Sequence, residues 1–330
     1  MAWLARRWAL RRWAAVSAAV VVLAAACDGD EPRVVPAPTA TPSSAPSPVP
    51  STPKSSPTFS PSPTVRARFR VDAALGTVRF LAGELGPREA TSDAYARAAA
   101  EVQRQLVDLG YAVERQRLRV PAGVSWGVKV AAGQTWNVVA RPSGFDASQP
   151  YRLVGAHLDT VPQAPGAEDN ASGVAVMLEL ARLTTARSRL PVVFVAFAAE
   201  EPRGDGEALH HFGSRAYVER MPPEQRRNLA GMISLDRVSV GSVVPVCTGS
   251  PGPAPLRSML LRTARRAGIP AEACTNTSSD HWSFELEQLP AVRIGGTPYP
   301  AYHSVADRPR VVNADQLRRV GRLLSSWLLR

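Results

Sequence analysis

Between residues 92 and 110 the apolar positions repeat with the spacing of an amphipathic helix. Ser92 is suited to cap the first turn, and Gly110 follows the last periodic position. Because the apolar residues recur at intervals of three and four, the pattern predicts a helix over residues 93–109 with one face toward a core. The stripe consists of Tyr95, Ala99, Val102, Leu106 and Leu109.

Two further helices are predicted later in the chain. One covers residues 172–184, where apolar residues are dense. The other covers residues 314–329 and has an apolar stripe on one side. That stripe is formed by Leu317, Val320, Leu324 and Trp327.

Short apolar runs between the helices have the character of buried strands. The run at residues 191–198 is almost continuously apolar, as expected of a central parallel strand covered on both faces. Because strands and helices alternate, the pattern predicts an α/β fold with a central mixed, mostly parallel sheet sandwiched between helices. The other predicted strands cover residues 111–120, 136–140, 151–156, 232–235 and 291–294.

The first residues of the chain have the pattern of an export signal. Four arginines at positions 6, 7, 11 and 12 precede an apolar run from Trp13 to Ala26. This run is too short to span a bilayer comfortably, and its charged-then-apolar order is typical of a signal peptide. We therefore expect residues 1–27 to direct export, with an uncleaved signal anchor as the alternative.

The end of this run resembles the lipobox of bacterial lipoproteins. Small residues precede Cys27, although Ala24 stands where the lipobox prefers a larger aliphatic residue. The resemblance implies that Cys27 is lipidated, and its acyl chains would hold the protein at a membrane surface. The expected location is extracytoplasmic, either lipid-anchored or secreted.

Residues 28–64 are rich in Pro, Ser, Thr and Ala and have no apolar periodicity. They predict a disordered linker, which proline biases toward extended polyproline II. At about 3.1 Å per residue, the run from Pro32 to Pro63 reaches on the order of 100 Å. Residues 65–330 are then expected to form a single domain with a substantial core.

The net charge does not indicate a nucleic-acid partner. The formal charge is +11, from 39 basic and 28 acidic residues. Of this charge, +8 falls on residues 65–330, where no basic run is interleaved with aromatic residues. The excess of arginine there is interpreted as a bias of composition.

Two cysteines, Cys247 and Cys274, follow Cys27. An even pair in an oxidising compartment favours a disulfide between them, with two free thiols as the alternative.

Acidic and histidine residues follow several of the predicted strands. His157 and Asp159 come after the strand at 151–156, Asp169 precedes a predicted helix, and Glu200 and Glu201 end the most apolar strand. The Asp159 carboxylate is placed to fix the tautomer of His157 from behind. The adjacent glutamates permit one to bind a metal while the other handles protons.

Two more candidates follow later strands, Asp236 after residues 232–235 and His303 in the loop after residues 291–294. The carboxyl ends of strands in such sheets form a common edge, so these side chains are expected to meet there. Two histidines and three carboxylates suit zinc, and a shared carboxylate would let two ions lie about 3.5–4 Å apart. The set is His157, Asp169, Glu201, Asp236 and His303.

Together these motifs resemble those of metallopeptidase family twenty-eight, the secreted di-zinc aminopeptidases and their relatives. The resemblance covers roughly residues 71–328 and implies a zinc exopeptidase fold of the phosphorylase/hydrolase-like kind. The matching segments are His157-Leu158-Asp159, residues 168–173, Glu200-Glu201, Leu235-Asp236 and Tyr302-His303-Ser304, supported by residues 86–88, 213–218 and 279–281.

The resemblance also implies a ligand set. One zinc ion would be held by His157 and Asp236 and the other by Glu201 and His303. Asp169 and a water would bridge them.

The same resemblance implies roles for residues beside the ligands. Glu200 would be the general base, and Tyr302 resembles a tyrosine that helps to hold the oxyanion. The peptide bond between Asp169 and Asn170 would be cis. The implied function is a co-catalytic di-zinc aminopeptidase, which we expect to act on peptides as a monomer.

Two departures from the family pattern bear on specificity. Arg237 stands where a methionine is common, and His210-His211 replaces Gly-Leu. Both lie near where a substrate could sit.

Three alternative functions stay open. Related di-zinc deacylases and dipeptidases share the motif from His157 to Pro162. Glutaminyl cyclases share the fold but bind one zinc ion and usually lack the first histidine. A non-catalytic, surface-displayed binding domain on the same fold is the third.

Overall fold

The computed structural model describes residues 68–329 except 186–187, 251 and 253. The chain divides into Met1–Ser62 and Pro63–Arg330, and every described residue belongs to the second unit. The expected signal peptide, the lipidation site Cys27 and the linker lie outside the described residues. Among the described helices, none is long and apolar enough to cross a membrane.

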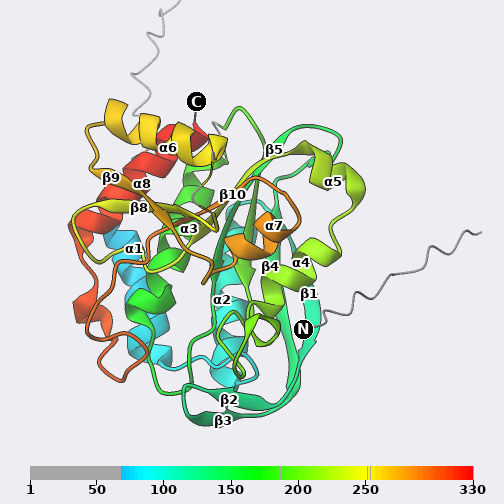
Figure 1. Ribbon diagram of the computed structural model, residues 1–330, viewed down its shortest axis with the longest axis vertical. Helices are drawn as coiled ribbons and strands as arrows, with labels where there is room; N and C mark the ends of the chain where they lie inside the picture. The colour runs from blue at the N-terminus through cyan, green and yellow to red at the C-terminus, as the bar shows by residue number, and fades with distance from the viewer. Residues whose placement is uncertain (1–67, 186–187, 251, 253, 330) are drawn as a thin grey trace, which may run out of the picture. The chain divides into compact units, whose positions relative to one another are not determined.

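An eight-stranded sheet forms the centre of the described unit (Figure 1). A separate two-stranded hairpin contains β2 (Gly123–Ser125) and β3 (Val128–Val130). In spatial order the large sheet contains β1 (Ala112–Val120), β4 (Gly133–Arg141), β6 (Val192–Phe197), β5 (Tyr151–His157), β7 (Leu229–Leu235), β10 (Ala291–Ile294), β8 (Val244–Thr248) and β9 (Ala271–Thr275).

The middle of the sheet is parallel. β6, β5, β7 and β10 run in one direction, whereas β1 and β4 on one side and the β8–β9 pair on the other introduce antiparallel neighbours. All six residues of β6 are buried, as its continuous apolar run requires. The predicted mixed, mostly parallel sheet is confirmed. The carboxyl ends of the parallel strands lie along one edge of the sheet.

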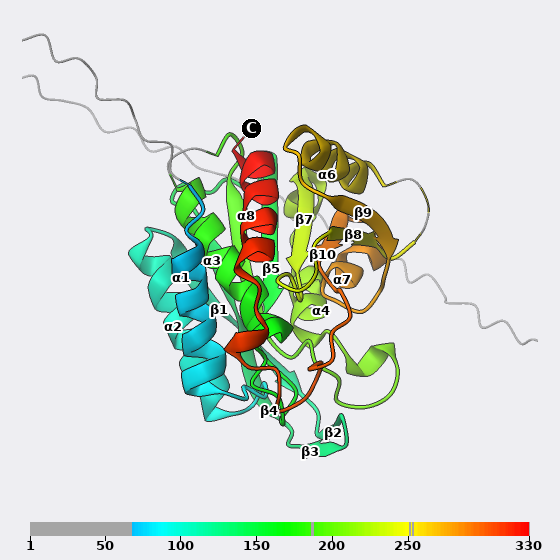
Figure 2. The same cartoon turned by 90° about the vertical axis from the view of Figure 1, so that its left-hand side faces the viewer.

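Helices cover both faces of the sheet (Figure 2). The larger apolar core lies under one set of helices and the smaller core under the other. The first set contains α1 (Val71–Val78), α2 (Asp93–Asp108), α3 (Ser172–Thr184), α6 (Pro255–Arg266) and α8 (Ala314–Leu328). The second contains α4 (Phe212–Glu219) and α7 (His281–Leu286), and the short α5 (Pro223–Asn228) follows α4.

Helix α2 begins where the sequence predicts. The Ser92 hydroxyl accepts the backbone N–H of Tyr95 at 3.1 Å, which satisfies one of the free donors of the first turn. The helix buries Tyr95, Val102 and Leu106 against the core. It continues to Asp108, one residue short of the predicted end.

Cys247 and Cys274 form a disulfide between neighbouring positions of the parallel strands β8 and β9. The bond ties β9, the strand at one edge of the sheet, to the rest of it.

Candidate metal centre

The candidate ligands come from five places along one edge of the sheet. His157 is the last residue of β5, and Asp236 directly follows β7. Glu201 lies just after β6, and His303 lies in the loop after β10. Asp169 belongs to the irregular segment Ala167–Ala171 that leads into α3, and its peptide bond to Asn170 is cis.

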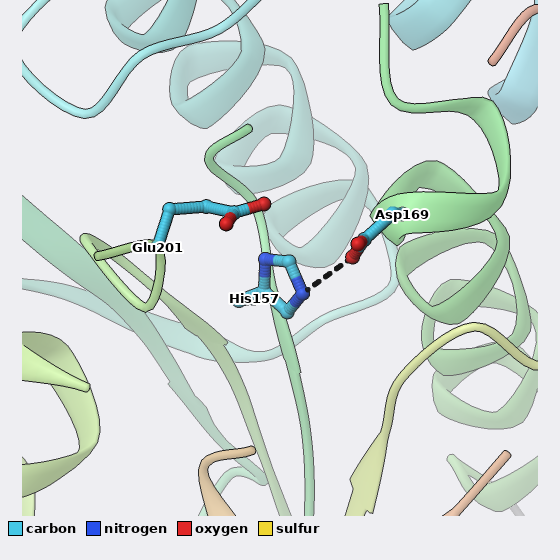
Figure 3. A group of neighbouring side chains, drawn as sticks. All are labelled: His157, Asp169 and Glu201. Carbon is cyan, nitrogen blue, oxygen red and sulfur yellow. Dashed lines mark ion pairs between the residues drawn. The ribbon is translucent and has the colours of Figure 1, made fainter. Parts of the chain in front are cut away.

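Asp169 lies between the two histidines. Its Oδ1 is 3.1 Å from His157 Nε2, and its Oδ2 is 3.1 Å from His303 Nε2. Figure 3 shows the carboxylate of Asp169 pointing at the His157 ring, with Glu201 on the other side of that ring. Each histidine also approaches a second carboxylate, His303 that of Glu201 at 3.3 Å and His157 that of Asp236 at 3.9 Å.

The charges at the centre hold Asp169 ionised. Burial would raise its pKa, but the close contacts of its carboxylate with His157 and His303 keep that pKa below its ordinary value. Glu201 differs, because burial raises its pKa to about 7 although the nearby His303 lowers it.

The donor atoms fit a metal. His157 Nε2, Glu201 Oε1 and Asp236 Oδ1 are buried and have no hydrogen-bond partner. Buried polar atoms without partners call for an explanation, and a bound ion is one. Ligand-type atoms of His157, Asp169 and Glu201 lie within 4.8 Å of one another, as do those of His157, Glu200 and Asp236. Imidazole nitrogens and carboxylate oxygens in this arrangement suit zinc.

The carboxylate of Asp159 lies on the Nδ1 side of the His157 ring, but the backbone oxygen of Asp159 is nearer to that nitrogen. His157 Nδ1 lies 3.1 Å from the backbone oxygen of Asp159, whereas the Asp159 carboxylate is 3.9 Å away. That carboxylate instead accepts the backbone N–H groups of Glu200 and Glu201, both at 3.1 Å. Burial raises the pKa of Asp159 to about 6. Asp159 therefore positions the turn that carries the two glutamates, because this turn follows β6, the strand that pairs with β5.

Glu200 faces a histidine that is not a candidate ligand. His211 Nε2 lies 3.3 Å from Glu200 Oε1, and both side chains are almost fully buried. Burial would raise the pKa of Glu200, but the nearby His157 and the hydrogen bond from His211 lower it. Glu200 is thus a carboxylate with a dedicated partner at the rim of the metal centre.

Aromatic rings surround His303. Tyr302 stacks on it with ring centroids 3.7 Å apart, and Trp126 meets it edge-on at 4.4 Å. Tyr302 is 37% exposed and, with Trp126, Glu200 and Glu201, lines a cavity of about 430 Å³. The centre therefore opens onto a space large enough for the end of a peptide.

The backbone around the centre has an unusual conformation. Among the described residues, six other than glycine have positive φ, and five of these surround the centre. Such conformations cost about 1–3 kcal/mol each and cluster at functional sites. The five are Trp126, Ala199, His211, Arg237 and His303.

Comparison with known families decides the membership of the chain. The family model of peptidase family M28 matches residues 137–328, a span that includes every candidate ligand. The chain belongs to peptidase family M28.

Curated relatives match this M28 chain over part of their length. Aminopeptidase YwaD of Bacillus subtilis is 30% identical over 185 residues, which are 52% of this chain and 39% of the relative. The probable lipoprotein aminopeptidase LpqL of Mycobacterium tuberculosis is 36% identical over 104 residues, which are 31% of this chain and 19% of the relative. The chain thus spans less than half of the length of these relatives.

Solved structures share the fold of this M28 chain. The zinc aminopeptidase BSAP from Bacillus subtilis superimposes with a TM-score of 0.70 at 18% identity, covering 78% of this chain and 94% of that one. The glutaminyl cyclase of Fimbriiglobus ruber gives a TM-score of 0.67 at 22% identity, covering 79% and 95%. The predicted fold class is confirmed, and the fold alone does not separate the two activities.

Several residues that support the M28 centre carry no role in the sequence argument. Asp307 accepts the backbone N–H of Glu168 at 2.9 Å and that of Asp169 at 3.1 Å, which orients the central carboxylate. Arg88 is fully buried and donates to five backbone oxygens, including those of Leu158 and Gly166. The one available signal is that Arg88 belongs to the matched segment 86–88 and Asp307 follows the matched segment Tyr302-His303-Ser304.

The two departures from the family pattern lie close to the centre. The Arg237 guanidinium lies over the Tyr302 ring, 4.4 Å from its centroid, and its Nε is 3.5 Å from Asp236 Oδ1. His210 and His211 both line the cavity, and His211 also contacts Glu200. Arg237 and His211 therefore contact site residues directly, in addition to the expected position of the two histidines beside the substrate space.

Proposed function

We propose that the chain is a zinc-dependent aminopeptidase that hydrolyses the N-terminal bond of peptides with two zinc ions. The observation that carries this proposal is the position of Asp169, whose two carboxylate oxygens each contact a different buried histidine. A shared carboxylate is the arrangement that two-metal hydrolysis needs. The names of the relative YwaD and of the structural neighbour BSAP support the same activity.

The proposed ligand sets follow the two halves of the cluster. His157 and Asp236 form one half, Glu201 and His303 form the other, and Asp169 is shared between them. Glu200 also lies within reach of an ion in the first half. We assign it to proton transfer because its carboxylate pairs with His211, which is outside the cluster.

In the proposed reaction the chain supplies proton transfer and orientation. Zinc, when bound, polarises a carbonyl group and lowers the pKa of water. Glu200 accepts the proton of the attacking water on its carboxylate and delivers it to the leaving amine. The Tyr302 hydroxyl, at the wall of the cavity, donates to the oxyanion that develops on the substrate.

A Glu200→Gln variant tests this assignment. The amide keeps the size of the side chain but cannot accept the proton, so turnover of aminoacyl-p-nitroanilides should fall by about 10²–10⁴-fold. Zinc content measured on the same sample should match that of the wild type. Full turnover by the zinc-loaded variant would refute the role of Glu200.

The rival activities are separable by substrate. A glutaminyl peptide incubated with the enzyme would yield pyroglutamate if the chain were a cyclase, and N-acylated amino acids would be cleaved if it were a deacylase. The presence of His157 argues against cyclase activity, since glutaminyl cyclases usually lack a histidine at this first ligand position. A protein that bound zinc but turned over none of these substrates would be a binding domain.

We also propose that Cys27 is lipidated and anchors the enzyme outside the cytoplasm. The relative LpqL is named a probable lipoprotein aminopeptidase, which supports this location. Globomycin should slow the mobility change that accompanies maturation in the producing bacterium. An unchanged pattern of bands would refute the anchor and leave the peptidase assignment intact.

A further inference from the structure

Trp126 stands at the tip of the hairpin formed by β2 and β3. The last pair of the hairpin is Ser125 and Val128, so its turn consists of Trp126 and Gly127. Both turn residues have positive φ, 46° and 82°, as a two-residue turn of type I′ requires. Asn, Asp and Gly suit such positions, whereas a bulky side chain is strained there. The tryptophan therefore carries a cost that the turn itself does not need.

The Trp126 side chain is exposed and faces the metal centre. It is 54% exposed, although a large apolar side chain stabilises a protein by being buried. Its ring meets that of His303 edge-on with centroids 4.4 Å apart, and that of Tyr302 at 5.7 Å. It also lines the cavity of about 430 Å³ that Glu200 and Glu201 line. The strained turn thus places an apolar ring beside the proposed ligands.

The hairpin is fixed to the segment that carries Glu201. Arg203 is buried, and its guanidinium donates to the backbone oxygens of Pro121 at 2.9 Å and Ala131 at 2.8 Å, on the two sides of the hairpin. A side chain at Gly123 would begin 1.8 Å from the Arg203 backbone oxygen, so glycine permits this close approach. The tip of the hairpin is therefore held in place by the segment that follows the ligand.

Aromatic and polar residues divide the lining of the cavity. Trp126 and Tyr302 contribute large apolar surfaces. Much of the remaining lining is polar or charged and includes Glu207, His210, Thr277 and Ser278. An apolar side chain of a substrate is expected against the aromatic pair, because burying it against polar groups would remove those groups from water without a partner.

The exposure of Trp126 indicates which part of a peptide it meets. An aminopeptidase must enclose the N-terminal residue, so the chain beyond the cleaved bond has to leave through the mouth of the cavity. Figures 1 and 2 both show the hairpin at one end of the described unit, and the half-exposed ring at its tip lies where the cavity meets solvent. Trp126 is therefore placed beside the residue that follows the cleaved bond.

We propose that Trp126 is a specificity-determining residue that packs against the residue after the cleaved bond and favours an apolar side chain there. This inference rests on the proposed function, because it assumes that peptides are hydrolysed at the centre. The hairpin precedes residues 137–328, so the family match supplies no role for it.

Dipeptides that differ only in the second residue test the proposal. Release of free leucine from Leu-Gly, Leu-Leu and Leu-Phe is measured by chromatography with the zinc-loaded protein. For the wild type, kcat/KM should be about tenfold or more higher for Leu-Leu and Leu-Phe than for Leu-Gly, as a filled apolar contact predicts. The substrates share their first residue, so the ratio of kcat/KM values does not depend on the metal content of the sample.

Trp126→Asn separates substrate contact from a structural role. Asparagine is favoured in this turn, so Tm should stay the same or rise, while the preference for Leu-Phe over Leu-Gly should fall to about threefold or less. Trp126→Phe should keep part of the preference. Val124→Thr is the matched control, because Val124 is 48% exposed on the same hairpin but is not among the residues that line the cavity. It should leave the preference unchanged.

The outcomes separate this inference from the function itself. A wild type without the preference, or a preference that Trp126→Asn leaves unchanged, would overturn the inference and keep the aminopeptidase. So would a variant that alters only the discrimination among Ala-Gly, Leu-Gly and Phe-Gly, since Trp126 would then contact the first residue. A protein that releases no N-terminal amino acid from any of these dipeptides would overturn both.

Discussion

The carboxylate of Asp159 holds the backbone of both glutamates that follow β6. An amide in its place offers one oxygen where two acceptors are needed. We expect Asp159→Asn to lower the free energy of unfolding by about 1–3 kcal/mol, since a buried donor is left unpaired, and to lower turnover as well. Urea unfolding measures the first effect. The exposed Asp108→Asn is the control, and equal stability of the two variants would contradict the role of Asp159.

His211 orients Glu200 through one contact of 3.3 Å. Hydrogen bonds to charged groups contribute about 1.5–3 kcal/mol, so His211→Leu should lower kcat by about tenfold or more. KM should change less, because the contact is to the proton-transfer group. His211→Gln, whose amide can donate, should recover part of the loss. A His211→Leu enzyme with normal kcat and zinc content would show that Glu200 needs no such partner.

Ligand-type residues at the ends of strands can be recognised in the sequence. The residues that contact them and hold them in place cannot. His157, Glu201 and Asp236 each stand at the end of an apolar run, and the chemistry of their side chains stands out there. Arg293 is itself inside such a run, but Asp236, with which it forms an ion pair at 3.1 Å, is distant in sequence and becomes visible as its partner only when β10 pairs with β7. The effect of Asp159 on the glutamate turn likewise depends on strand order.

At the scale of elements, Glu179 joins α3 to the segment before α1. Its carboxylate accepts from the Arg70 backbone and guanidinium and from Arg182. Burial would raise its pKa, but these hydrogen bonds hold that pKa below the ordinary value of 4.5. A group whose pKa is lowered in the folded state stabilises above its unfolded pKa and loses that contribution as pH falls through the folded value.

Glu179→Gln should therefore lower Tm at pH 7, and the difference from the wild type should shrink as pH falls below about 4.5. Thermal unfolding followed by circular dichroism from pH 7 to pH 4 measures it. A difference that stays constant or grows toward low pH would contradict the ion-pair account.

The disulfide fixes an element at one edge of the sheet. Cys247 and Cys274 are 27 residues apart, and closing a loop of this size stabilises by about 3–4 kcal/mol in the chain-entropy account. Cys247→Ala with Cys274→Ala should cost about that much in urea unfolding. Reducing agent should destabilise the wild type and leave the double variant unaffected. Equal sensitivity of both proteins would contradict the prediction.

Long periodic elements were predictable, and short or mixed ones were not. The helix after Ser92 is found within one residue because it contains four turns of regular apolar spacing. Helix α7 has six residues, too few to show a period. Strand β9 leaves all five of its residues partly or fully exposed, so no apolar run marks it. Helix α1 and the turn after it contain Gly76 and Gly83, which weaken a helical pattern.

At the scale of the molecule, alternating strands and helices are enough to predict the fold class but not the strand order. β4 pairs antiparallel with β6, and β8 with β10, through connections that no local pattern specifies. The fold in turn does not decide the reaction, since aminopeptidases and glutaminyl cyclases share it. The activity therefore depends on the metal centre and on what the cavity beside it accepts.

Reversible metal removal tests the zinc aminopeptidase most directly. Hydrolysis of a panel of aminoacyl-p-nitroanilides is measured before chelation, after chelation and after zinc is restored, with zinc content determined at each stage. Metal that binds only the folded state stabilises it, so Tm should fall and recover together with hydrolysis. The account predicts that release of the free amine product stops without zinc and returns with it. Hydrolysis that persists in the metal-free protein would contradict it.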